Sequence, residues 1–242
     1  MSMLLTLTLL GAVGGSPVIA ETRFTDRLRE RAAAIWEQEM NHPFVKGLGD
    51  GSLPLEKFQY YLRQDYRFLV DYARVMALAT ARANDVATMT RFSDLLSSTL
   101  KEEMELQRRF AERLDMNPAE LEATVATPTT YAYTRHLLLV AEKGSLAEVV
   151  AGVLPCAWGY YEIASRLAQQ VSPSHHPFYA EWIGLYASEE SKRYVEELRD
   201  LLDFLVEGLP ESRLEELEEI FLTSSRYELL FWEMAYRQES WP

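Results

Sequence analysis

Cysteine is almost absent from this sequence, since Cys156 is the only one among 242 residues. A single thiol cannot form a disulfide bond within the chain, so cross-linking of that kind is excluded. Three roles remain open for Cys156: a nucleophile, a ligand or a small residue of the core.

Positive charge is also scarce. The chain has 24 Lys and Arg residues against 37 Asp and Glu residues, which gives a formal net charge of -13 and a pI near 4.8. The basic residues do not gather in any segment, and an acidic surface repels nucleic-acid phosphates and anionic lipids. We therefore predict neither a nucleic-acid partner nor a membrane partner.

Long apolar runs are missing except near the N-terminus, where residues 3–13 are apolar and small residues follow up to Ala20. This run is too short to span a bilayer. It resembles a secretory signal peptide but lacks the Lys or Arg that normally precedes the apolar part. We predict an N-terminal extension over residues 1–22 and a cytoplasmic protein, with secretion through residues 1–20 as the alternative.

Linker-like segments and strand patterns are missing from the rest, which predicts one all-helical domain over residues 23–242. Apolar spacing and capping residues predict helices over 24–40, 54–83, 85–114, 118–125, 128–143, 145–171, 178–187, 189–207 and 210–237. Residues 47–51 are rich in glycine and predict a turn. Thr223, Ser224 and Ser225 predict a break in the last helix, because short hydroxyl side chains compete with the helical backbone.

Two acidic residues fall on apolar helix faces. Asp65 stands where the pattern of its helix calls for a core residue, and Glu228 does so in the last helix. A buried carboxylate must be hydrogen-bonded, paired or protonated. In a third helix, Pro155 removes a backbone hydrogen bond beside Cys156, and a kink there could open a pocket with Tyr160 one turn further on.

Each feature also has an ordinary structural explanation. A free cysteine is often a small core residue, and an inward acid often pairs with Arg or caps a helix. Tyrosines can be core residues whose hydroxyls reach the surface, and this applies to Tyr131, Tyr133, Tyr160, Tyr161, Tyr186 and Tyr227. Together, however, one thiol, two inward acids and several tyrosines favour a binding site for a flat, polar heteroaromatic ring.

Six segments, in order along the chain, resemble the TenA/thiaminase II family. They are residues 42–45 with 49–54 (HPFV and GDGSLP), 60–65 (YYLRQD), 128–134 (PTTYAYT), 154–162 (LPCAWGYYE), 182–186 (WIGLY) and 224–236 (SSRYELLFWEMAY). The resemblance covers almost all of residues 24–241. It implies a single-domain, heme-oxygenase-like helical fold without heme, assembled as a homotetramer and needing no cofactor or metal.

The implied activity is that of an aminopyrimidine aminohydrolase, or thiaminase II. Its expected reaction converts 4-amino-5-aminomethyl-2-methylpyrimidine to the hydroxymethyl pyrimidine and ammonia, in the salvage of thiamin breakdown products. The same site can cleave thiamin into its pyrimidine and thiazole parts. Because a cysteine follows the proline of the fourth segment, the resemblance places the chain in the cysteine-type branch.

The resemblance also assigns roles to single residues. Cys156 matches the nucleophile that adds to the pyrimidine ring, and Glu228 matches the general acid/base. Asp65 matches the acid that hydrogen-bonds the aminopyrimidine. The remaining substrate-binding positions are aromatic, namely Phe68, Tyr133, Tyr160, Tyr186 and Phe231.

Phe68 departs from the family pattern, because close relatives place a tyrosine one turn after the aspartate. Without that hydroxyl one polar contact is lost, which predicts a slower but competent enzyme.

Two other functions stay open on the sequence. One is a non-catalytic, regulatory protein that binds thiamin or a pyrimidine on the same fold. The other is a di-iron oxidase on the related helical scaffold, which needs several inward Glu, Asp and His ligands. The chain offers four histidines for such a site, His42, His136, His175 and His176, and three of them fall in predicted loops.

Overall fold

The computed structural model describes residues 23–170 and 176–242, and within these ranges the chain is helical and contains no strand. The all-helical prediction is therefore confirmed. The predicted extension over residues 1–22 lies outside the described ranges, and so does His175. The buried hydrophobic side chains form one cluster, and that residues 23–242 make a single domain stays a prediction.

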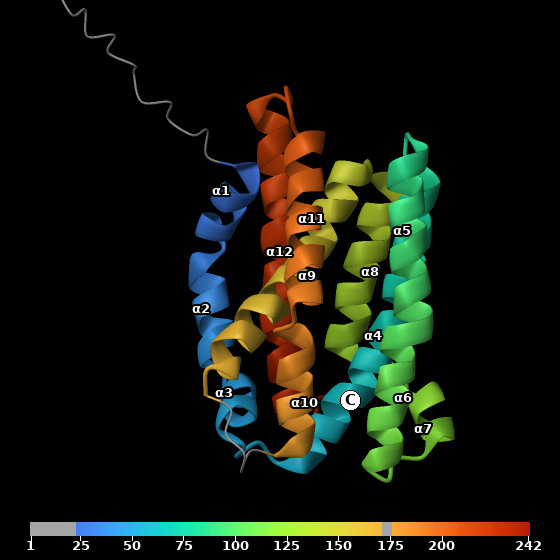
Figure 1. The fold of residues 1–242 in the computed structure, drawn as a ribbon, viewed down its shortest axis with the longest axis vertical. Coiled ribbons are helices and arrows are strands. Elements are labelled where there is room, and N and C mark those ends of the chain that lie inside the picture. Colours follow the sequence, from blue (N-terminus) through green and yellow to red (C-terminus); the bar gives the residue numbers. More distant parts are fainter. Residues whose placement is uncertain (1–22, 171–175) are drawn as a thin grey trace, which may run out of the picture.

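The helices lie mainly along the long axis of the molecule (Figure 1). Their bounds are α1 Phe24–Arg31, α2 Ala33–Asn41, α3 Pro43–Asp50, α4 Leu55–Arg82, α5 Val86–Ser98, the π-helix η1 Thr99–Glu103, α6 Met104–Arg113, α7 Pro118–Glu122, α8 Pro128–Lys143, α9 Leu146–Ala168, α10 Pro177–Tyr186, α11 Glu189–Leu205 and α12 Glu211–Arg237. Most predicted helices are found with nearly the predicted bounds.

Helix α9 occupies the centre of the fold. It runs obliquely through the bundle (Figure 1) and packs against α8, α10, α11 and α12. It begins with a capping box, in which Ser145 and Glu148 satisfy each other's backbone groups. It continues through Pro155 in its interior. Any residue that α9 turns inward therefore meets several other helices.

The glycine-rich turn predicted over residues 47–51 is wrong, because α3 runs through most of it. Pro43 occupies the first turn, and Gly51 ends the helix in the left-handed region with a φ of 78°. Gly47 and Gly49 serve close packing instead of turning the chain. A Cβ on Gly47 would lie 3.0 Å from backbone atoms of Leu53.

The break predicted at residues 223–225 is also wrong, because α12 is continuous there. The hydroxyls of Ser224 and Ser225 are fully buried and are used in tertiary hydrogen bonds. Trp36 Nε1 donates to Ser225 Oγ at 3.0 Å, and His136 Nε2 lies 3.2 Å from Ser224 Oγ. Such partners remove the competition with the helical backbone on which the prediction depended.

A third difference concerns the helix predicted over residues 85–114. It is interrupted by η1, a π-helical turn between α5 and α6. One-residue widening of this kind re-aims the side chains that follow it and is frequent at functional sites.

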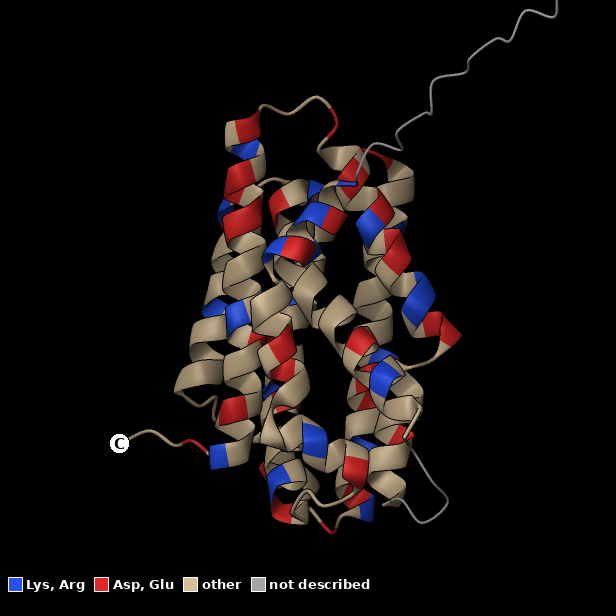
Figure 2. Ribbon diagram, turned by 90° about the vertical axis from the view of Figure 1, so that its left-hand side faces the viewer, with Lys and Arg blue, Asp and Glu red and all other residues tan. Residues whose placement is uncertain are grey.

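The surface carries both signs of charge. In Figure 2 acidic and basic residues alternate along the same helices, as expected when their side chains form ion pairs on the helix surfaces. Within the described ranges, no helix combines the length and apolar character needed to cross a membrane.

The two glycine environments predict opposite effects of an added methyl group. Gly47→Ala should lower the free energy of unfolding by about 1–3 kcal/mol, because its Cβ meets the Leu53 backbone. Gly184→Ala should raise it by about 0.5–1 kcal/mol, since Gly184 lies inside α10 with open space around it. Urea unfolding of both variants measures this. Equal stabilities would show that α3 does not depend on close approach at Gly47.

Candidate active site

The eight residues singled out in the sequence come from five helices and lie in one region of the core. Helix α4 supplies Asp65 and Phe68, α8 supplies Tyr133, α9 supplies Cys156 and Tyr160, α10 supplies Tyr186, and α12 supplies Glu228 and Phe231. Their side chains are linked by the hydrogen bonds, ring contacts and charge interactions described below. Sequence positions more than 160 residues apart are thus brought together.

Glu228 is the polar centre of this region. Its side chain is 3% exposed and lies on the face of α12 that also buries Phe231 and Trp232. The hydroxyl of Tyr133 donates to Glu228 Oε1 at 2.5 Å, and the thiol of Cys156 donates to the same carboxyl group. Burial raises the pKa of Glu228 to about 7, although both hydrogen bonds act in the opposite direction. The carboxyl group can therefore take up or release a proton near neutral pH.

Burial also raises the pKa of the Cys156 thiol well above its ordinary value. The charges of Glu228, Glu103 and Asp65 add to this effect, since each disfavours a nearby thiolate. The thiol is therefore protonated unless its proton is accepted as it reacts. Glu228, to which it is hydrogen-bonded, is placed to accept that proton.

Asp65 is a second enclosed acid, with a side chain that is 5% exposed. Its hydrogen-bond donor is the amide Nε2 of Gln107, not the Arg that an ordinary structural carboxylate would have. Burial raises the pKa of Asp65, and the charges of Glu103 and Glu228 raise it further, whereas the bond from Gln107 lowers it. Asp65 can thus act as a hydrogen-bond donor as well as an acceptor.

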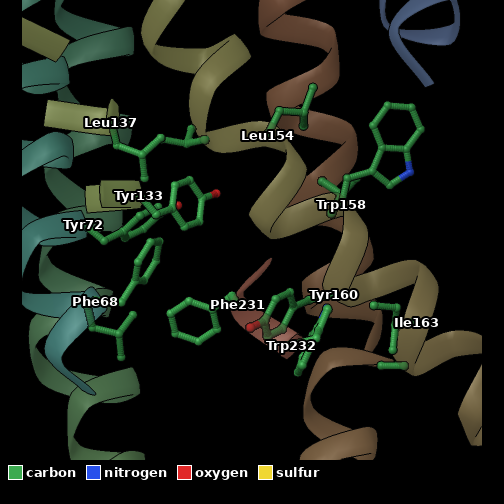
Figure 3. Close-up of a cluster of buried hydrophobic side chains, with 14 of the residues drawn as sticks. Phe68, Tyr72, Tyr133, Leu137, Leu154, Trp158, Tyr160, Ile163, Phe231 and Trp232 are labelled. Atoms are coloured by element: carbon green, nitrogen blue, oxygen red, sulfur yellow. The ribbon is translucent and has the colours of Figure 1, made fainter. Parts of the chain in front are cut away.

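Aromatic rings form the wall of the region. The centroid of Phe68 lies 5.1 Å from that of Tyr133 and 5.9 Å from that of Phe231. Figure 3 shows Phe231 between Phe68 on one side and Tyr160 on the other. Tyr160 is in contact with Tyr186, at 5.1 Å between ring centroids. Flat faces on several sides favour a flat ligand.

The thiol and its neighbours keep some accessible surface although they lie deep in the protein. Cys156, Glu103, Tyr186 and Tyr194 are each partly accessible, while burial is the main cause of every pKa rise among them. These side chains are therefore largely shielded from water without being wholly covered by other atoms. Two open surface hollows lie elsewhere, and their linings contain neither the thiol nor an enclosed acid of the site.

Three polar residues of this region were not predicted from the sequence. Glu103 ends η1, accepts a hydrogen bond from Tyr186 at 3.5 Å, and burial raises its pKa to about 7. Glu39 of α2 is buried, and the pKa of its carboxyl group is raised by burial and by Glu228. Gln107 could have been found, since it stands in the apolar stripe of α6 as Asp65 does in α4. Nothing in the sequence marks the π-helix that aims Glu103.

The other tyrosines divide between site and surface. Tyr227 stacks on Tyr133, with 5.2 Å between ring centroids. Tyr131 is half exposed and lies against Trp241.

A di-iron site needs a set of several ligands. In the described ranges no group of three or more His, Cys, Asp or Glu is arranged to hold a metal ion. His42 caps α3 and pairs with Glu233, His136 bonds Ser224, and His176 stacks on Tyr179. These histidines serve local structure.

Comparison with known proteins adds a family to this geometry. A family model described as TENA/THI-4/PQQC matches residues 29–238. A curated relative from Halalkalibacterium halodurans, named aminopyrimidine aminohydrolase, is 50% identical over 90% of this chain and 97% of its own length. A relative of the same name from Bacillus subtilis is 40% identical over 90% of this chain and 92% of its own.

Solved structures agree on the fold. The TenA homologue from P. horikoshii superimposes with a TM-score of 0.84 at 34% identity, over 89% of this chain and 99% of that one. A Shewanella denitrificans domain described as heme-oxygenase-like has a TM-score of 0.72 at 11% identity, over 88% of this chain and 92% of that one. The prediction of a heme-oxygenase-like helical fold is confirmed.

The raised pKa of Glu228 predicts a pH-dependent stability. An acid whose pKa is higher in the folded state stabilises the fold below its unfolded pKa of about 4.5, and that stability is lost as the pH rises to about 7. Gln does not ionise, so Glu228→Gln avoids this loss. Between pH 4.5 and 7 the free energy of unfolding of Glu228→Gln should rise relative to that of the wild type by on the order of 3 kcal/mol. Urea unfolding at several pH values measures the difference.

Glu148→Gln is the control of opposite sign. Burial raises the pKa of Glu148, but hydrogen bonds from Ser145 and Arg213 lower it by more, so its net shift is downward. This carboxylate stabilises the fold near neutral pH, and its contribution is lost on acidification. If the free energy of unfolding of Glu228→Gln and that of the wild type change in parallel between pH 4.5 and 8, the raised pKa of Glu228 is contradicted.

Proposed function

The chain belongs to the TENA/THI-4/PQQC family, and from that premise we propose that it hydrolyses 4-amino-5-aminomethyl-2-methylpyrimidine to the hydroxymethyl pyrimidine and ammonia. The chain is a hydrolase, since relatives named aminopyrimidine aminohydrolase match nearly its whole length at 40–50% identity. The proposed place of the reaction is the salvage of thiamin breakdown products. Thiamin itself is a second substrate of the proposed site, with thiazole as the leaving group.

One observation carries the mechanistic proposal: Tyr133, Glu228 and Cys156 form a hydrogen-bonded chain inside the core. A thiol next to a carboxyl group with a pKa of about 7 supports a nucleophile with its own proton acceptor. The tyrosine fixes the carboxyl group, which leaves its second oxygen free for the thiol or the substrate.

The first proposed step forms a bond between Sγ of Cys156 and an electron-poor carbon of the pyrimidine ring. The thiol proton passes to Glu228 as the bond forms. The electron pair that enters the ring then breaks the bond from the exocyclic methylene carbon to its amino nitrogen. Glu228 returns the proton to that nitrogen, so ammonia leaves as a neutral molecule.

The second proposed step adds water to the exposed methylene carbon. The water gives one proton to Glu228, and the bond between Sγ and the ring breaks, which restores the aromatic pyrimidine. The departing thiolate takes the proton back from Glu228, and the site returns to its starting state. The sum is substrate plus water giving the hydroxymethyl pyrimidine plus ammonia.

Asp65 is the proposed anchor of the pyrimidine. As an enclosed acid of raised pKa, it can donate to a ring nitrogen and accept from the neighbouring amino group. Protonation or hydrogen bonding at a ring nitrogen draws electrons from the ring and favours attack by the thiol. Tyr160, Tyr186 and Phe231 are proposed to hold the ring by its faces and edge.

The quaternary structure and location are proposals of a different kind. A homotetramer in the cytoplasm is proposed from the family resemblance. Large apolar side chains that are about half exposed, such as Leu139 and Leu230, support burial against other copies of the chain.

Ammonia release tests the catalytic assignments. Cys156→Ser should reduce turnover of the aminomethyl pyrimidine to near background, because the hydroxyl is a far weaker nucleophile. Glu228→Gln should lower kcat by about 10²–10⁴-fold through loss of general acid/base catalysis. Glu219→Gln, an exposed acid on the same helix, is the matched control and should retain wild-type activity. Undiminished turnover in Cys156→Ser would rule out the thiol mechanism.

Phe68 provides a second test. The Phe68 ring contacts Tyr133, Tyr72 and Phe231, so Phe68→Tyr adds a hydroxyl to the aromatic wall of the proposed ring site. One added hydrogen bond to the substrate should raise kcat/KM by up to about tenfold. If steady-state kinetics of the two proteins are identical, position 68 does not contact the substrate.

A further inference from the structure

Gln107 holds a polar atom that the protein leaves unpaired. Its side chain is 3% exposed, and its Nε2 donates to Asp65 Oδ2. Its Oε1 is buried and meets no hydrogen-bond donor in residues 23–170 or 176–242. Buried carbonyl oxygens are nearly always paired in folded proteins, so this acceptor needs an explanation.

Gln64 shows how the same fold treats an amide that serves structure. It is also buried, one residue before Asp65 on α4. Its Nε2 donates to the carbonyl of Val125 at 3.1 Å, and its Oε1 accepts from the Thr127 amide at 3.1 Å and the Thr130 hydroxyl at 2.8 Å. Both ends of the Gln64 amide are satisfied, unlike those of Gln107.

The position of Gln107 points to the proposed substrate site. It lies four residues after Glu103, so both side chains project from the same face of the helical stretch that η1 and α6 form. Glu103 is bonded by Tyr186, and its charge acts on both Asp65 and Cys156. This face is therefore turned toward the acids and the thiol.

The chemistry of an aminopyrimidine matches what is left unpaired. Its exocyclic ring amino group carries two N–H donors, and a bound ring needs an acceptor for each of them. Asp65 supplies one acceptor and, when protonated, a donor for the adjacent ring nitrogen. The carbonyl oxygen of Gln107, on the amide already bonded to Asp65, can supply the second acceptor.

We propose that Gln107 is a specificity-determining residue whose Oε1 accepts a hydrogen bond from the ring amino group, so that the site selects 4-aminopyrimidines over 4-oxopyrimidines. This inference rests on the proposed function and adds a recognition element to it. A 4-oxo ring brings a carbonyl oxygen to the same place, and two acceptors then face each other in a buried site. The oxo ring is rejected because both oxygens stay unpaired.

Binding of two rings tests the proposal without requiring turnover. The probes are 4-amino-5-hydroxymethyl-2-methylpyrimidine and its 4-oxo counterpart, titrated by calorimetry into the wild type, Gln107→Met and Gln64→Met. The wild type should bind the amino ring at least about tenfold more tightly than the oxo ring. In Gln107→Met this ratio should fall toward one, because methionine has the length of glutamine but no oxygen acceptor. Gln64→Met should keep the wild-type ratio.

If Gln107 acts only by holding Asp65 in place, Gln107→Met should weaken the binding of both rings equally. The ratio of the two affinities would then be the same as in the wild type. That result overturns the inference while leaving the proposed function intact. A wild type that binds neither ring overturns both. A wild type that prefers the oxo ring would show that the amide presents its NH₂ group to the ligand, which also overturns the assignment of Oε1.

Urea unfolding of the two variants gives an independent readout. Gln64→Met loses four hydrogen bonds, whereas Gln107→Met loses one and removes an unpaired acceptor. The urea midpoint should therefore fall further for Gln64→Met. A larger fall for Gln107→Met would show that Gln107 serves the fold and would count against its role in recognition.

Discussion

The enclosure of several acids beside one thiol is the constraint on which the rest of this structure depends. Asp65, Glu103 and Glu228 lie close enough for their charges to act on one another or on Cys156. Burial raises the pKa of each acid, so the site cannot hold three carboxylates and a thiolate at once. Tyrosine hydroxyls and an amide, in place of guanidinium groups, are the hydrogen-bond partners that hold these acids. Their protons therefore remain available for exchange.

The packing around the site supports this arrangement of protons. Helix α12 must run without interruption to place Glu228 and Phe231 on one inward face, and its buried serines allow this because Trp36 and His136 engage their hydroxyls. Helix α9 must be central so that Cys156 meets α12. Aromatic rings around them keep out bulk water, which maintains the raised pKa values. The same rings provide flat surfaces. One set of side chains therefore both maintains the raised pKa values of the acids and favours a flat ligand.

The sequence predicted the helical fold and the inward acids because both leave a periodic signal. Asp65 and Glu228 interrupt apolar stripes, and a stripe is set by the local backbone alone. The features that were missed depend on contacts between distant segments. The glycines of α3 are explained by their approach to Leu53 and Leu167, and the serines of α12 by partners on α2 and α8. The aim of Glu103 depends on a π-turn that residue propensities do not encode.

The charge of the ligand follows from the charge of the site. An anion bound beside these acids would keep them protonated, because two negative charges repel each other. The unfavourable free energy is largest for the most deeply buried acid. A cation, such as an amine-bearing ring, would favour their ionised forms and bring a proton into the hydrogen-bonded chain of Tyr133, Glu228 and Cys156. The overall charge of -13 acts in the same direction by attracting cations and repelling anions. Ligand binding and proton supply are therefore coupled, because the group that draws the ligand in is also the group that must give up or accept the proton.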